Sequence, residues 1–116
     1  MATGDPVRVF KGLDALTPWG DDTKRLQHAR RAQGQKFDTL MRMKAVRALA
    51  QGERDEVVDA TYVACPLCRI QLSARERRIG NFVWGEDSVH YLTVHQIWPE
   101  ELDWLLDWLQ HNGVDL

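Results

Sequence analysis

Two close pairs of metal-binding residues constrain the fold of this chain more than any other feature. Cys65 and Cys68 are the only cysteines among 116 residues, and His90 and His95 follow them in the pattern C-x2-C-x21-H-x4-H. Thiolates and imidazoles in two such pairs are the ligands that a tetrahedral zinc ion takes. The spacing therefore predicts one structural Zn²⁺ per chain, held by Cys65, Cys68, His90 and His95.

Two other interpretations of the cysteine pair stay open from the sequence. Cys65 and Cys68 could be small buried apolar residues, with the two histidines half-buried and unrelated to them. A redox C-x2-C pair would place its first cysteine at the start of a helix, where the thiol pKa falls. The residues after Cys68 instead alternate as a strand, so zinc is the favoured interpretation.

The spacing of the two histidines predicts where the second one lies. Five residues of an ideal helix rotate by about 140°, so His90 and His95 do not share one face of a regular helix. We therefore expect His95 to lie where the helix frays or tightens. Pro99, shortly downstream, also favours a helix end in this region.

The motifs of the chain do not indicate catalysis. Four protein ligands fill a tetrahedron and leave no position for water, so the predicted site is structural rather than catalytic. The zinc-deaminase pattern is absent, because the sequence has no H-x-E and its cysteine pair precedes the histidines. No Gly-rich phosphate loop or nucleophile elbow appears either. We predict that the protein is not an enzyme.

Length and composition favour a small globular protein in the cytoplasm. At 116 residues, with 44% hydrophobic and 28% charged residues, the chain suits one compact domain. Its apolar runs are far shorter than the roughly 18 residues of a transmembrane helix, and its first residues do not resemble a signal peptide. We expect an N-terminal helical part over residues 1–56 and a zinc-binding ββα-like part over 57–116.

The N-terminal part is expected to be irregular over its first 20 residues and helical afterwards. Helices are expected over about 21–33 and 37–51, and Gly52 is the natural residue after the second. Early apolar side chains could dock on the core, and those of the second helix should share one face. The first set is Val7, Val9, Phe10, Leu13 and Leu16, and the second is Phe37, Leu40, Met41, Ala45, Ala48 and Leu49.

The C-terminal part is expected to form a hairpin and two helices. We predict a strand over 57–64 leading into the cysteines, and Ile70 and Leu72 continue an alternating pattern after them. Residues 73–81 are expected to be a charged turn, with 82–84 as the return strand. A short helix starting at Asp87 or Ser88 should carry the histidines, and a last helix should run from Pro99 to Asn112-Gly113. The predicted fold class is α+β, with N-terminal helices packed on a zinc-knuckle β-hairpin, then a short helix and an aromatic-rich C-terminal helix.

The segment from Cys65 to about Leu105 resembles a zinc-finger-like module of small, mostly uncharacterised bacterial and phage proteins. The resemblance implies zinc and a compact ββα-like unit, but no activity. Its gap of 21 residues between the ligand pairs is longer than the gap of about 12 in DNA-reading fingers, so their mode of base readout is in doubt. The residues that carry the resemblance are Cys65, Cys68, Trp84, His90-Tyr91, His95 and Pro99.

Charge is distributed unevenly along a chain whose net charge is −2. Residues 24–54 hold nine cations and two carboxylates, a net charge of +7, whereas residues 99–116 hold five carboxylates and no Lys or Arg. Such basic residues could contact the phosphates of a nucleic acid, or they could form solvated helix faces. The candidates are Arg25, Arg30, Arg31, Lys36, Arg42, Lys44 and Arg47, with Arg75, Arg77 and Arg78 on the expected turn.

The last helix has an unusually wide apolar surface. Its large apolar side chains span roughly 200° of the circumference, more than packing on one core requires. Either the two parts of the chain clasp this helix from two sides, or Trp104 and Trp108 form a partner or dimer interface. We predict a zinc-stabilised, non-enzymatic binding module, a protein-interaction or regulatory factor that acts through this helix; nucleic-acid binding is the alternative. The apolar residues are Leu102, Trp104, Leu105, Leu106, Trp108 and Leu109.

Overall fold

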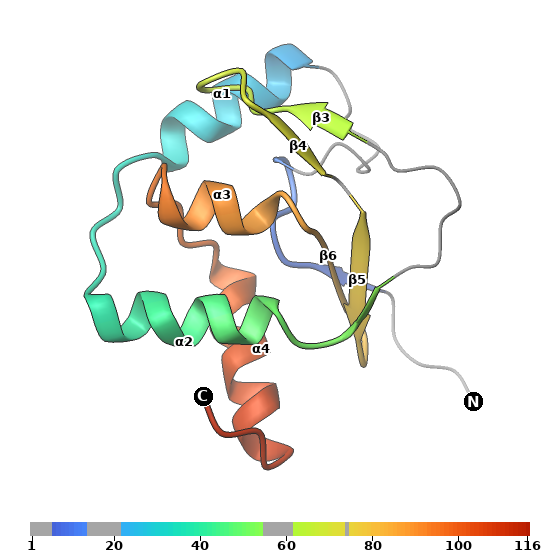
Figure 1. Cartoon of the computed structure of the whole chain (residues 1–116). Coiled ribbons are helices and arrows are strands. Elements are labelled where there is room, and N and C mark those ends of the chain that lie inside the picture. Colours follow the sequence, from blue (N-terminus) through green and yellow to red (C-terminus); the bar gives the residue numbers. More distant parts are fainter. Residues whose placement is uncertain (1–5, 14–21, 55–61, 74) are drawn as a thin grey trace.

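A computed structural model describes residues 6–13, 22–54, 62–73 and 75–116 of the chain (Figure 1). Its main sheet has four strands in the order β1-β6-β5-β2, with β1 parallel to β6 and the other neighbours antiparallel. These strands are β1 (Val7–Arg8), β2 (Glu53–Arg54), β5 (Glu76–Ile79) and β6 (Phe82–Gly85).

A separate two-stranded hairpin and four helices complete the described part of the chain. The hairpin pairs β3 (Tyr62–Ala64) with β4 (Gln71–Ser73) in antiparallel register. The mixture of helices and small sheets confirms the predicted α+β class. The helices are α1 (Asp22–Ala32), α2 (Thr39–Leu49), α3 (Ser88–Thr93) and α4 (Glu100–His111).

Local signals set both ends of α2. The Asp38 carboxylate accepts a hydrogen bond from the Met41 amide at 2.7 Å, which caps the N-terminus. After the helix, Gly52 adopts φ +89°, and a Cβ there would lie 2.7 Å from the Arg78 carbonyl oxygen. Only glycine therefore lets the chain turn from α2 into β2 while passing so close to β5.

The core lies between β6, α2, α3 and α4. All four residues of β6 are buried, and the Trp84 indole N–H donates to the Leu49 carbonyl at 3.0 Å, which ties the sheet to the end of α2. The helix α4 buries Leu102, Leu105 and Leu109, and α2 packs against it. The helix therefore contacts both an N-terminal helix and, through Trp108 and Phe82, the C-terminal part of the chain, as expected for a helix clasped from two sides.

The N-terminal segment is more regular than predicted. Val7 and Arg8 form a strand that pairs with Phe82 and Val83 of β6, so an irregular start was wrong for these residues. The predicted docking was correct for the apolar side chains that follow, because Val9, Phe10 and Leu13 are buried. Leu16 lies outside the described residues.

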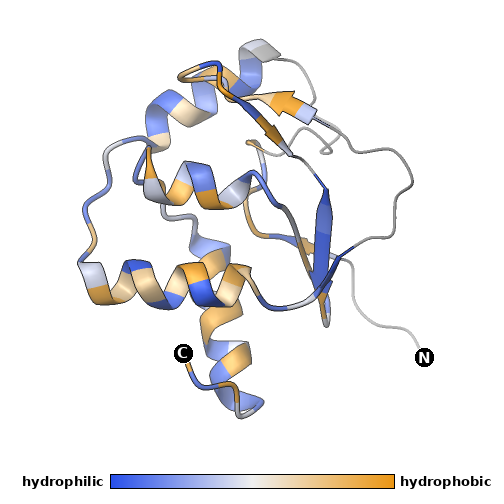
Figure 2. Cartoon of the chain, viewed as in Figure 1, coloured by the Kyte–Doolittle hydropathy of each residue, from blue (hydrophilic) through white to orange (hydrophobic). Residues whose placement is uncertain are grey.

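The predicted charged turn over 73–81 is in part a strand. Glu76–Ile79 form β5, which lies between β2 and β6 and connects to β6 through the two residues Gly80 and Asn81. Figure 2 shows β5 as an almost uniformly hydrophilic strand, so it lacks the apolar alternation that marks a strand in a sequence. Ion pairs stabilise it instead: Glu76 contacts Arg8 and Arg78.

The described part of the chain therefore contains two hairpins rather than the single one predicted. The strand Tyr62–Ala64 pairs with Gln71–Ser73 around the cysteines, and Phe82–Gly85 pairs with β5. The predicted strand residues 57–61 lie outside the described residues. The physical reason is the second turn: Gly80 adopts φ +56° and reverses the chain within two residues.

The apolar face predicted for α2 is only partly correct. Ala45, Ala48 and Leu49 are buried, but Leu40 and Met41 are exposed. These two side chains belong to the first turn of α2, at the end away from β2 and the sheet (Figure 1). No helix in the described part of the chain has the length and apolar character needed to span a membrane.

Candidate metal centre

The two cysteines lie at the tip of the β3–β4 hairpin. Cys65 directly follows β3, and its amide donates to the Ile70 carbonyl at 2.9 Å, which continues the strand pairing by one step. The Arg69 amide donates back to the Cys65 carbonyl at 2.9 Å, and Arg69 adopts φ +66°. The Leu67 amide donates to the Cys65 sulfur at 3.4 Å. This turn brings Cys68 back beside Cys65.

The two histidines come from α3 and from the residues just beyond it. His90 lies within Ser88–Thr93, whereas His95 follows the last helical residue by two positions. The prediction that the second histidine lies where the helix ends is thus correct. Gln96 then adopts φ +54° and turns the chain toward α4. Both ligand pairs are followed directly by a residue in the left-handed region, Arg69 or Gln96.

The four side chains meet with distances that suit one tetrahedral metal ion. Cys65 Sγ lies 3.3 Å from His95 Nε2, and Cys68 Sγ lies 3.2 Å from His90 Nε2. The two Nε2 atoms are 3.2 Å apart, and all four atoms lie within 4.8 Å of one another. A tetrahedron with ordinary zinc–ligand bond lengths has N···N edges of about 3.3 Å and S···N edges of about 3.6 Å. The quartet could therefore hold a metal ion after shifts of a few tenths of an ångström.

Burial prepares these groups for metal binding. Burial lowers the pKa of His90, with a smaller contribution from the neighbouring His95, and burial also lowers the pKa of His95. The histidines are thus held in the neutral form that ligates metals. Burial raises the pKa of the Cys65 thiol, against the opposing effect of nearby backbone N–H groups. A metal ion that binds Cys65 must therefore displace a proton.

Tyr91 anchors α3 to the rest of the molecule. Its buried ring contacts His90 edge-on at 6.0 Å between centroids, and Phe10 lies on it at 6.3 Å. The Arg25 guanidinium donates to the Tyr91 hydroxyl at 3.3 Å and to the Leu13 carbonyl at 3.0 Å. Burial raises the pKa of Tyr91, with a further contribution from Asp87. The helix that presents His90 is thereby fixed to α1.

Sequence reasoning placed Arg25 among the candidate phosphate-binding residues, and this was wrong. Its side chain is buried and holds Tyr91 and the Leu13 carbonyl. A pattern in the sequence could have indicated this, because Arg25, Ala29 and Ala32 recur at i, i+4 and i+7 along the face of α1 that packs inward.

The other candidate cations do not form one group of similar exposed side chains. Arg77 is half-buried and donates to Glu86 and to the Ala50 and Gly52 carbonyls. Arg78 pairs with Glu76, and Arg42 stacks on the Phe37 ring at 5.4 Å. Arg75 and Lys44 are half-buried, and Arg30, Arg31, Lys36 and Arg47 are exposed.

The two tryptophans of α4 differ in their surroundings. Trp108 is half-buried, and its ring meets Phe82 edge-on at 6.2 Å and covers Gly80. Trp104 is 47% exposed in the middle of the same helix. Trp108 thus contributes to the packing of α4 on the β5–β6 hairpin, and Trp104 is the aromatic residue that α4 presents to solvent.

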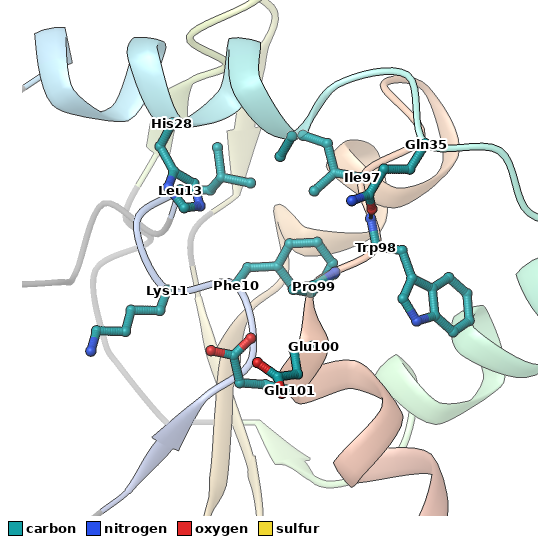
Figure 3. Close-up of a pocket in the computed structure, with 11 residues that line it drawn as sticks. Phe10, Lys11, Leu13, His28, Gln35, Ile97, Trp98, Pro99, Glu100 and Glu101 are labelled. Carbon is teal, nitrogen blue, oxygen red and sulfur yellow. Dashed lines mark hydrogen bonds between the residues drawn. The ribbon is translucent and has the colours of Figure 1, made fainter.

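A pocket of about 390 Å³ lies on another part of the surface, between α1 and the start of α4 (Figure 3). Its lining includes the apolar side chains of Phe10, Leu13 and Ile97 and the carboxylates of Glu100 and Glu101. None of the four cysteine and histidine ligands lines this pocket. The pocket and the candidate metal centre are therefore separate features.

Comparisons with known proteins add no assignment. No protein-family model matches the chain, and no curated protein or solved structure matches it either. What the fold and site define is an α+β protein with a possible Cys2His2 metal centre.

Proposed function

We propose that this protein is a zinc-stabilised, non-enzymatic binding module that contacts a protein partner through the exposed side of α4. The observation that carries the metal part is the meeting of Cys65, Cys68, His90 and His95 within 4.8 Å of one another. Two thiolates and two imidazoles in a tetrahedral arrangement favour Zn²⁺ over metals that prefer oxygen ligands or square-planar geometry.

The ligand set supports a structural role for the metal. All four coordination positions are supplied by side chains, so no position is left for water or substrate. The ligands join one hairpin to one helix, and metal binding would cross-link β3–β4 to α3. Such a cross-link converts the free energy of metal binding into folding free energy of the segments it joins.

The exposed side of α4 supports the binding role. Trp104 leaves a large aromatic surface in water, with Glu100 one turn before it and Asp107 about one turn after it. Exposed aromatic side chains are enriched where proteins meet partners, because they bury a large area at low cost in side-chain entropy. Trp108 does not offer such an exposed aromatic surface, since its ring packs on Gly80 and Phe82.

Native mass spectrometry of reduced protein, with and without a chelator, tests the metal part. We expect one zinc ion per chain, and removal of the ion should reduce the ordered structure seen by circular dichroism. His111→Ala is the matched control, because His111 is exposed and lies outside the quartet. The proposed centre would be ruled out if freshly purified wild-type protein bound no zinc. It would also be ruled out if the Cys68→Ser variant bound zinc as well as the wild type does.

Cobalt substitution separates a structural centre from a catalytic one. Co²⁺ in a closed site of two sulfurs and two nitrogens should give tetrahedral ligand-field bands that do not change when azide is added. A shift of those bands on addition of azide would reveal an open coordination position. That result would contradict the non-enzymatic assignment.

A further inference from the structure

The outward faces of α2 and α4 carry complementary features. On α2, Leu40, Met43 and Arg47 recur at i, i+3 and i+7, a spacing that places them on one side of a helix. Leu40 is 60% exposed and Met43 is 46% exposed, so this side faces solvent. On α4, Glu100, Trp104 and Asp107 recur at i, i+4 and i+7, and all three are exposed. Each helix thus presents large apolar side chains to solvent, with charged residues beside them.

The charges on these two faces are opposite in sign. Among residues 39–49 there are three cations and no carboxylate, whereas residues 100–111 hold four carboxylates and no Lys or Arg. None of the ion pairs found within the described residues involves a charged side chain of either helix. The two helices pack against each other through their buried sides. Arg47 on α2 and Glu100, Asp103 and Asp107 on α4 are exposed, so opposite charges lie on the outward faces without an ion pair inside the described part of the chain.

We propose that a second copy of this chain covers these faces, with α2 of one copy on α4 of the other. This inference rests on the proposed function and names the protein partner of α4. Leu40 and Met43 would bury Trp104, and Lys44 and Arg47 would meet carboxylates. Acidic residues lie on both sides of Trp104, so either relative direction of the two helices pairs opposite charges.

The shape of the molecule suits a reciprocal contact. Figure 1 shows α2 lying across α4, with the C-terminal part of α4 projecting beyond it. The α4 face with Glu100, Trp104 and Asp107 of each copy can receive the α2 of the other copy. An isologous dimer of this kind uses the same pair of faces twice, once from each copy. A basic helix that meets an acidic helix also disfavours the alternative contacts of α2 with α2 and of α4 with α4.

Charge reversal on either helix tests the dimer by sedimentation equilibrium of the zinc-loaded full chain. The wild type should be a dimer, and Lys44→Glu with Arg47→Glu should weaken dimerisation by at least about a hundredfold, because like charges then face each other. Glu100→Lys with Asp107→Lys should weaken it similarly. When the two variants are mixed, every contact is again between opposite charges, so a heterodimer should form.

The control changes the same charge elsewhere. Arg30→Glu with Arg31→Glu alters the net charge equally on exposed residues of α1 and should leave the dimer intact. A wild type that stays monomeric overturns the inference, as do mixed variants that fail to associate or a control that dissociates as strongly. Zinc content measured on the same samples keeps the two proposals apart. A zinc-loaded monomer refutes only the second copy, whereas a chain without zinc refutes the metal-stabilised module.

Discussion

The two hairpins in the described part of this protein are both antiparallel but are stabilised in different ways. In the β5–β6 hairpin, every residue of β6 is buried, and Trp84 donates a hydrogen bond to the end of α2. In the β3–β4 hairpin, Tyr62, Ala64 and Gln71 are exposed, and Val63 and Leu72 are only half-buried. The first hairpin is part of a hydrophobic core. The second buries too little apolar surface to be stable by itself.

This difference explains why the cysteines lie where they do. A short hairpin without a core requires another cross-link, and the turn between β3 and β4 places Cys65 and Cys68 against His90 and His95. On the proposed account, metal binding replaces hydrophobic burial as the force that holds β3–β4 on the molecule. The β5–β6 hairpin, which has its own core, should be largely independent of metal.

Removal of a metal ligand should have the largest effect, and it should act on the β3–β4 hairpin. Cys65→Ser replaces a buried cysteine with a poor zinc ligand. Even changes next to a ligand typically cost 10- to 100-fold in affinity, so we expect a loss of at least about 100-fold here. Competition with a chromophoric chelator measures it. A zinc affinity within threefold of the wild type would contradict the proposal that a metal ion bound by Cys65 holds the β3–β4 hairpin.

Truncation of Trp84 should have the next largest effect and should act on the other hairpin. Trp84→Ala removes a fully buried indole and its hydrogen bond to Leu49, which we expect to cost about 3–5 kcal/mol. Urea unfolding of the zinc-loaded protein measures the change. Tyr62→Ala, at a 59% exposed position of β3, is the matched aromatic control and should cost less than about 1 kcal/mol. Equal costs at the two positions would show that the hairpins do not differ as described.

Two glycines with the same backbone angle test why the turn into β2 requires glycine. Gly52 and Gly34 both have φ +89°, but only at Gly52 would a Cβ meet other atoms, the nearest at 2.7 Å. Gly34→Ala should cost about 1–2 kcal/mol from the left-handed conformation alone. Gly52→Ala should cost clearly more, because the Arg78 carbonyl must also move. Thermal unfolding compares the two, and equal costs would mean that the close approach does not matter.

The smallest predicted effect concerns Glu86, which links the two hairpins. Its carboxylate accepts hydrogen bonds from the Ser73 hydroxyl in β4, from Arg54 at 2.9 Å and from Arg77 at 3.3 Å. Burial alone would raise the pKa of Glu86, but Arg54 and Arg77 outweigh it and hold the pKa below its usual value. The folded state therefore binds the proton more weakly than the unfolded state does.

The stabilisation from Glu86 should consequently be complete above its ordinary pKa of about 4.5 and disappear as the pH falls through its lower value in the folded protein. Glu86→Gln should cost about 1 kcal/mol at pH 7. The gap between wild type and variant in urea unfolding should close toward pH 3. A gap that stays constant between pH 7 and pH 3 would contradict this role.

The sequence predicted those features that depend on a few residues with specific chemistry. Ligand chemistry predicts that Cys65 and His95 come together. Helix geometry predicts that His95 lies beyond the end of α3 and that α4 ends at Asn112. Whether a metal occupies the quartet, and whether Trp104 meets a partner, remain predictions.

Features that depend on tertiary partners could not be predicted in this way. The strand β5 is stabilised by Arg8, which lies far from it in the sequence, and by Glu86, which follows the next strand, and its own residues suggest a solvated turn. The spacing of Arg25 with Ala29 and Ala32 could have indicated that its side chain packs inward, but its partner Tyr91 lies 66 residues away and could not be inferred. Leu40 looked like a core residue because periodicity does not reveal where the core ends.

Amide hydrogen exchange of the zinc-loaded and chelated protein distinguishes a hairpin held by a metal ion from one held by a hydrophobic core. We expect chelation to strip protection from β3 and β4, while β6, α2, α3 and α4 keep most of theirs. Protection in β3–β4 that survives chelation, or protection lost equally from β6 and β3, would contradict the claim that a metal ion holds one hairpin and a hydrophobic core holds the other.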